Sequence, residues 1–88
     1  MLVHAGTIPA HKLRHGIWLH DPRVDIIVRP LVDDAGKILH NWREVRAVRW
    51  DRGSDTVVVK FRDRLPLIGD MILIKSDSIV DVAVEEID

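Results

Sequence analysis

Short segments rich in Val, Ile and Trp alternate with turn-forming residues along this chain. Over residues 56–62 the positions on one side are all apolar, and over residues 80–85 valines alternate with polar or small residues. An alternation of period two places one side of a strand on the core and the other toward solvent. The pattern predicts strands in both segments. It also predicts a shared core built from Val57, Val59, Phe61, Val82 and Val84.

Turn signals divide the rest of the chain at short, regular intervals, which is typical of a compact β fold. Clusters of Gly, Pro, Asp and Ser predict turns at 14–16, 21–23, 33–37, 51–55 and 76–78, and a loop at 65–70. The segments between them predict strands at 7–10, 17–20, 24–29 and 71–75, the last of them buried. Pro9 has no backbone donor, so the first of these strands is expected at a sheet edge.

Residues 38–50 admit two interpretations. Their apolar residues at 38, 42, 45 and 48 come close to a helical period. As a strand, the segment would point Val45 and Val48 to opposite faces unless a one-residue bulge lies between them. We favour the strand, because the apolar residues of 45–50 (VRAVRW) are mainly β-branched or aromatic and helix caps are missing; the helix is the alternative.

The length of 88 residues and the absence of cysteine limit how the fold is stabilised. Neither disulfides nor thiolate metal sites can form, so stability depends on apolar packing or on association. We predict a single all-β domain over residues 1–88, a small five- to six-stranded antiparallel barrel or barrel-like sheet with at most one short helix or turn. Open strand edges in so small a fold predict self-association or docking onto a partner.

Two segments resemble known small β proteins. Residues 8–19 (IPAHKLRHGIWL) resemble the opening motif of Hint (hedgehog/intein-like) barrels, in which an apolar strand, a Leu and then Gly-Asp lead into the next strand. Residues 42–48 with 57–61 resemble short hypothetical β proteins of actinobacteria and their phages. The chain departs from Hint enzymes, because Ile17 stands where Asp is usual and neither the N-terminal Cys or Ser nucleophile nor the C-terminal Asn is present. The resemblance therefore implies a barrel fold and a phage or actinobacterial origin, without self-splicing chemistry.

Charge is unevenly distributed although the formal net charge is only −1. Residues 37–64 include eight basic and four acidic residues, whereas residues 65–88 include one basic and six acidic residues. The two regions can neutralise each other in the fold or serve different partners. The N-terminus lacks the features of a signal peptide and no apolar run is long enough to span a bilayer. We expect a cytoplasmic protein without membrane contact, located in the host cytoplasm if it comes from a phage.

The basic stretch is the candidate for nucleic-acid binding. Arginines recur at every third position beside Trp42 and Trp50, and three more cations follow on the next strand. On one sheet face such residues could bind phosphates and stack bases. The candidate residues are Arg43, Arg46, Arg49, Arg52, Lys60, Arg62 and Arg64.

A structural interpretation competes with this one. A step of three residues sends alternate arginines to opposite faces of a strand. The three tryptophans, Trp18, Trp42 and Trp50, would then fill the core, since Phe61 is the only other aromatic residue. The arginines would pair with acids of the C-terminal strand, namely Asp81, Glu85 and Glu86.

Metal-binding and catalytic motifs are weak. His11, His15 and His20 could supply imidazole ligands if their strands converge, but they can equally lie apart in exposed turns, and the chain has no HxH or HExxH motif. Ser54, Ser76 and Ser78 lie in predicted turns without a recognisable base. We expect no metal, no cofactor and no enzymatic activity.

These observations favour a non-enzymatic protein–protein interaction or assembly module. A phage origin would suit a small protein that acts on a host protein or takes a place in the virion. The alternative is a nucleic-acid-binding small barrel that uses the basic surface between Arg43 and Arg64.

Overall fold

The computed structural model describes residues 2–24, 31–32, 38–39 and 42–86. These form strands and tight turns with a single short 3-10 segment at Ala10–Lys12, so the all-β antiparallel prediction is confirmed. One sheet contains six strands, in the order β1 (Leu2–Pro9), β8 (Ile79–Glu85), β2 (Trp18–His20), β5 (Trp42–Asp51), β6 (Thr56–Leu65) and β7 (Gly69–Lys75). No helix in the described ranges has the length and apolar character needed to cross a membrane.

A second, two-stranded sheet pairs β3 (Leu31–Val32) with β4 (Ile38–Leu39) in antiparallel register. This pairing agrees with a hairpin at that point of the chain, although the predicted turn at 33–37 lies outside the described residues. The strand expected at 24–29 also lies outside them, apart from Val24, whose backbone is helical, so the strand prediction is wrong at that residue. That residue is buried, and its N–H donates to the carbonyl oxygen of Asp21.

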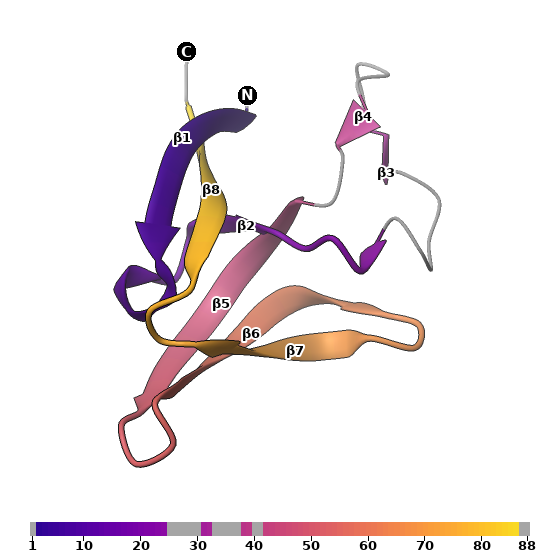
Figure 1. Ribbon diagram of the computed structural model, residues 1–88. Coiled ribbons are helices and arrows are strands. Elements are labelled where there is room, and N and C mark those ends of the chain that lie inside the picture. The colour runs from indigo at the N-terminus through magenta and orange to yellow at the C-terminus, as the bar shows by residue number, and fades with distance from the viewer. Residues whose placement is uncertain (1, 25–30, 33–37, 40–41, 87–88) are drawn as a thin grey trace.

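The six-stranded sheet is barrel-like but does not close. Its two ends are β1, the edge strand that carries Pro9 as predicted, and β7. β2 is only three residues long and pairs with β8 at Val82 and Ala83 alone. In Figure 1 the β6–β7 hairpin extends away from β1 and β8, which lie side by side. A seam therefore separates β7 from the first half of β8.

A bulge in β5 determines which of its side chains point toward the core. Val45 pairs with Phe61, but Ala47 pairs with Lys60, so Arg46 is an extra residue in β5. The bulge puts Val45 and Val48 on the same side, where Val45 is buried and Val48 packs against the core. The strand interpretation with its bulge is therefore confirmed, and the helix alternative is wrong over the described residues of this segment.

Most of the predicted core is confirmed. Val57, Val59, Phe61 and Val82 are buried, in one cluster with Ala10, Leu13, Leu19 and Val45. The prediction for Val84 is wrong, because 37% of this residue is exposed. Val84 pairs with Val3 of the edge strand, beyond the two β8 residues that pair with β2.

The three tryptophans do not fill this core. Trp50 is 41% exposed, and Trp18 and Trp42 are half-buried. Trp18 pairs with Ala83, on the face of β8 opposite to Val82. Trp42 lies between the rings of His4 and His20, at centroid distances of 5.8 and 5.4 Å. The structural interpretation that placed the tryptophans in the main core is therefore wrong, because valines and Phe61 fill it.

Replacing Phe61 with Ala should destabilise the protein by about 3–5 kcal/mol, since the side chain is fully buried and its removal leaves a cavity. Val84→Ala is the control and should change stability by less than about 1 kcal/mol. Urea unfolding of both variants measures the difference. Equal stabilities would contradict the core described above.

Candidate functional site around the β6–β7 hairpin

Arg43 is the largest fully buried side chain of the described residues, with 1% of its surface exposed. Its guanidinium donates four hydrogen bonds, from Nε to Asp63 Oδ1 (2.9 Å), from Nη1 to Asp21 Oδ2 (2.9 Å), and from Nη2 to the carbonyl oxygens of Asp63 (3.2 Å) and Gly69 (2.7 Å). The ring of Phe61 lies 4.0 Å from Cζ. Arg43 is therefore not part of an exposed phosphate-binding strip, and it pairs with neither Asp81 nor the acidic end of β8.

Asp21 is the buried counter-ion of Arg43, with its side chain fully enclosed. Arg23 also binds it, with Nε 2.9 Å from Oδ1 and Nη2 2.7 Å from Oδ2. Burial by itself would raise the pKa of Asp21, but the hydrogen bonds from Arg23 and Arg43 outweigh it and lower the pKa below its ordinary value of 3.8. Asp21 is therefore held as a carboxylate between two guanidinium groups.

This buried charge cluster holds the base of the β6–β7 turn. The carbonyls of Asp63 and Gly69 flank the turn on its two strands, and the same nitrogen of Arg43 binds both. Between them Leu67 is 91% exposed and has a φ of 70°, a conformation that disfavours a branched side chain. The turn end of the β6–β7 hairpin is thus held against β5 and against the turn that follows β2.

The sequence did not identify Asp21 or Asp63 as partners of Arg43, since 21–23 reads as an ordinary turn and Asp63 as a surface residue. One signal was present. Arg43 lies two positions before Val45 on the same strand, so the alternation that buries Val45 also points Arg43 inward. A cation at a core position requires buried acceptors, which polar residues of neighbouring turns can provide.

Among the described residues β7 ends the sheet, so its outer backbone edge pairs with no strand there; the carbonyl of Lys75 accepts a hydrogen bond from the N–H of Ser78 in the following turn. The N–H of Ser76 donates to the carbonyl of Asp55 at 3.0 Å, and bonded pairs alternate along an antiparallel ladder. Ile72 and Ile74 consequently direct their backbone groups toward β6, whereas Met71, Leu73 and Lys75 direct theirs to the opposite side. β7 was predicted to be buried, and this is wrong for its outer face, where Leu73 is 61% exposed.

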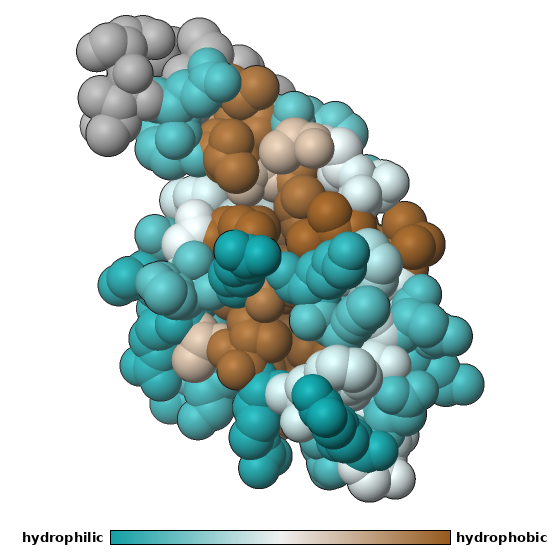
Figure 2. Space-filling view, turned by 90° about the vertical axis from the view of Figure 1, so that its left-hand side faces the viewer, coloured by the Kyte–Doolittle hydropathy of each residue, from teal (hydrophilic) through white to brown (hydrophobic). Residues whose placement is uncertain are grey.

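The seam beside β7 forms an apolar groove of about 370 Å³. Ile72, Leu73 and Ile74 of β7 line one wall, and Ile79 and Val80 of β8 line the other. The polar residues at the groove are His20 and Asp81. Figure 2 shows the side of the molecule that carries β1 and β8, where apolar side chains lie between polar ones. We call this feature the seam groove.

The predicted basic residues lie in three places. Arg43 is in the interior, Arg52 is in a turn, and the others are on the outer face of the central strands. Arg52 lies in the β5–β6 turn, with Cζ 4.8 Å from the ring of Trp50, and Arg62 forms an ion pair with Glu44 at 3.0 Å. The others lie on the outer face of the central strands, opposite the core: Arg46, Arg49, Lys60 and Arg64. The structure therefore brings together part of the predicted set, without Arg43 and Arg52.

The histidines contact different partners. His11 stacks on Trp50 at 5.2 Å, His15 is exposed, and His20 packs edge-on against Trp42. His4 lies 3.2 Å from Asp81, and His40 is outside the described residues. Within the described ranges, no three His, Asp or Glu side chains are grouped closely enough to hold a metal ion.

Comparison with known proteins gives no family for this chain. No family model matches it, and no curated protein and no solved structure is significantly similar to it. The resemblance to Hint-like barrels and to small actinobacterial or phage proteins stays a prediction.

Asp21→Ala should destabilise the protein by about 3–5 kcal/mol, because it leaves the Arg43 guanidinium buried with one partner missing. The matched control is Arg62→Ala, which removes an exposed ion pair worth less than about 1 kcal/mol. Chemical denaturation at neutral pH compares the two. A small effect of Asp21→Ala would show that Arg43 does not depend on this carboxylate.

The lowered pKa of Asp21 also predicts a pH dependence. As the pH falls below 3.8, the unfolded chain binds a proton at Asp21 before the folded protein does, so the stabilisation by this carboxylate declines. Asp21→Asn cannot ionise, and its stability deficit relative to the unmodified protein should shrink below about pH 4. Urea unfolding over a pH series tests this, and a deficit that stays constant on acidification would contradict it.

Proposed function

We propose that this protein is a non-catalytic protein–protein interaction module that binds an extended segment of a partner by strand addition at β7. The observation that carries the proposal is the outer edge of β7, which pairs with no described strand and lies beside the seam groove. In strand addition, backbone hydrogen bonds supply affinity, while pockets for alternate side chains supply specificity. The outward-facing backbone of β7 and the groove next to it offer both.

Apolar exposure supports this proposal. Met71 and Leu73 are exposed on the outer face of β7, and Ile79 is 64% exposed across the seam. Full burial of one such side chain contributes about 1.5–3 kcal/mol, so three of them are a substantial source of binding energy. Natural edge strands are commonly protected by charges or proline; β7 carries two charges, Asp70 and Lys75, near its ends and none on the four residues between them.

Preorganisation supports it further. The buried Arg43 cluster fastens the turn end of the hairpin, and Ser76 Oγ donates to Asp55 Oδ1 at 2.5 Å at the other end. A strand held at both ends loses little conformational entropy on binding. When the added strand comes from a second copy of this chain, the same edge serves an assembly function.

Nucleic-acid binding is less well supported. Arg43 is buried, Arg62 is paired with Glu44, and Arg52 stacks on Trp50 at the turn. Sequence-tolerant binding of single strands also relies on aromatic platforms beside the cations. The outer face that carries Arg46, Arg49 and Lys60 has Val58 and Met71 between them instead.

Charging the edge should abolish partner binding. Leu73→Lys places a cation on the outer face of β7, where the side chain is already exposed, so thermal stability should change little. The matched control is Leu67→Lys, the same substitution at an exposed leucine in the turn outside the strand edge. The measurement is affinity capture from a nuclease-treated lysate of the source organism, together with sedimentation of each variant alone.

We expect the unmodified protein and Leu67→Lys to retain a protein partner, or to self-associate, and Leu73→Lys to do neither. Equal capture by both variants would contradict binding at β7. Capture that nuclease treatment abolishes would favour nucleic acid as the primary ligand.

A further inference from the structure

The outer face of the central strands carries a second groove, separate from the seam groove, with a volume of about 390 Å³. Its apolar floor is formed by Ala47, Val58 and Met71. Three cations surround that floor, namely Arg46, Arg49 and Lys60, and none of the described residues that line the groove is acidic. We call this feature the basic groove.

The β5 bulge creates the basic groove. In a regular strand Arg46 and Arg49 would point to opposite faces, because three residues separate them. Since Arg46 is the extra residue of the bulge, Ala47 lies opposite Lys60 and Arg49 lies opposite Val58, both on the outer face. The same irregularity that brings Val45 and Val48 to the core thus gathers three cations on the other side.

The acids of this face offset only part of the charge of the three cations. Glu44 forms its ion pair with Arg62, at 3.0 Å. Asp51 accepts hydrogen bonds from the backbone N–H groups of Gly53 (3.1 Å) and Ser54 (3.4 Å). Hydrogen bonds from Ser54 and, to a smaller extent, the charge of Arg49 lower the pKa of Asp51, so Asp51 offsets part of the positive charge of this face. Among the described residues, no ion pair within 4.0 Å holds Arg46, Arg49 or Lys60. The basic groove therefore has a net positive charge, only part of which is offset, over an apolar floor.

We infer that the basic groove binds an acidic segment of a partner protein, with an apolar side chain on the floor and carboxylates beside the three cations. Charge complementarity requires an anionic occupant. The apolar floor favours an anionic segment that also carries aliphatic side chains. A phosphate placed over Val58 and Met71 would lose its hydrogen bonds to water without gaining others in exchange. Trp50, which could stack a base, pairs with Val57 on the inner side and does not line the groove.

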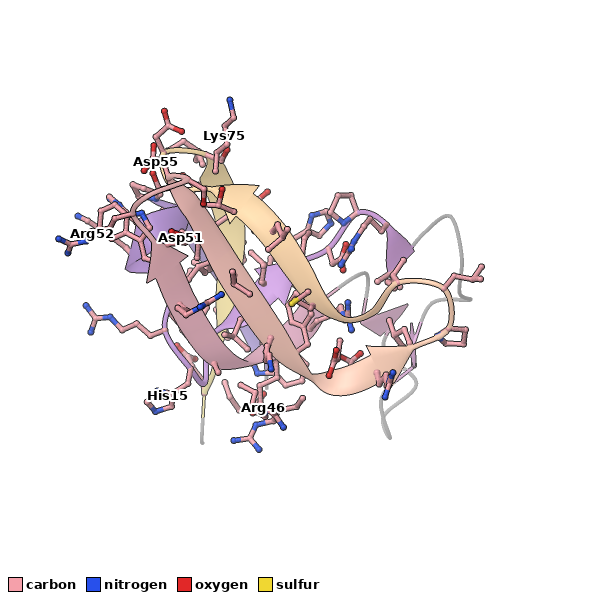
Figure 3. All side chains as sticks on the ribbon, turned by 90° about the horizontal axis from the view of Figure 1, so that it is seen from below. His15, Arg46, Asp51, Arg52, Asp55 and Lys75 are labelled. Atoms are coloured by element: carbon pink, nitrogen blue, oxygen red, sulfur yellow. The ribbon has the colours of Figure 1, made fainter. Side chains whose placement is uncertain are left out.

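This site shares Met71 with the β7 edge, but its three cations lie on β5 and β6. In Figure 3 Arg46 extends away from the strands, and Arg52 lies at the far end of the β5–β6 hairpin, close to Asp51. Arg52 and Arg64 are basic and exposed but do not line the groove. They therefore supply a control with the same change of charge.

The probes are a fluorescent peptide of alternating Glu and Leu pairs, the same peptide with Gln in place of Glu, and a single-stranded oligonucleotide of equal charge. Anisotropy titrations at low and moderate salt give the affinities. We expect the acidic peptide to bind about tenfold more tightly than its amide version, and less tightly as salt increases. Arg46→Ala with Arg49→Ala should weaken binding of the acidic peptide by about tenfold.

The control double variant, Arg52→Ala with Arg64→Ala, should bind the acidic peptide within about twofold of the unmodified protein. Leu73→Lys should bind the acidic peptide at least as tightly, because it adds a cation opposite Val58 and removes none. Loss of partner capture with retained peptide binding therefore distinguishes failure of the β7 proposal from failure of this one. Thermal unfolding verifies that each variant is folded.

Three results would overturn the inference. The acidic peptide could bind no better than its amide version, or the two double variants could lose affinity equally. The oligonucleotide could bind more tightly than the acidic peptide and lose affinity in Arg46→Ala with Arg49→Ala, which would assign the groove to nucleic acid.

Discussion

The buried ion pair between Arg43 and Asp21 is the constraint on which the arrangement of the other strands depends. Taking two charges out of water is unfavourable, and only a complete set of hydrogen bonds offsets it. The acceptors of Arg43 come from the turn after β2, from β6 and from the start of β7. Satisfying one guanidinium therefore requires these three segments to meet at the same point. Arg23, which binds both carboxylate oxygens of Asp21, completes the hydrogen bonding of the cluster.

A consequence of this constraint is an open sheet. The Arg43 cluster holds the turn end of the β6–β7 hairpin toward β5, and the short β2 leaves the first half of β8 without a neighbour on that side. β7 consequently ends the sheet with apolar side chains on both faces. The β5 bulge adds a second asymmetry, because it places three cations over an apolar floor. Both proposed binding surfaces thus originate in the irregular parts of the fold.

The sequence predicted what depends on local alternation. The valines of β6 lie on the core side as expected, the turn at 51–55 forms, and the conflict between Val45 and Val48 correctly indicated a bulge. Contacts between residues that are distant in the chain could not be predicted from the sequence pattern. Burial of Arg43 depends on acceptors that are distant in the chain, so spacing alone placed it on the surface with Arg46 and Arg49. One interpretation placed Trp50 in the core because aromatic residues are few, but Trp50 is 41% exposed and the buried cluster contains valines and Phe61 instead.

Amide hydrogen exchange along β7, followed by NMR on the free protein, tests the open edge most directly. If β7 is bonded on one side only, the amides of Ile72 and Ile74 should exchange slowly and those of Met71, Leu73 and Lys75 rapidly. This alternation with period two is the predicted result. Equal protection of all five amides would contradict the account, since it would mean that both sides of β7 are already paired.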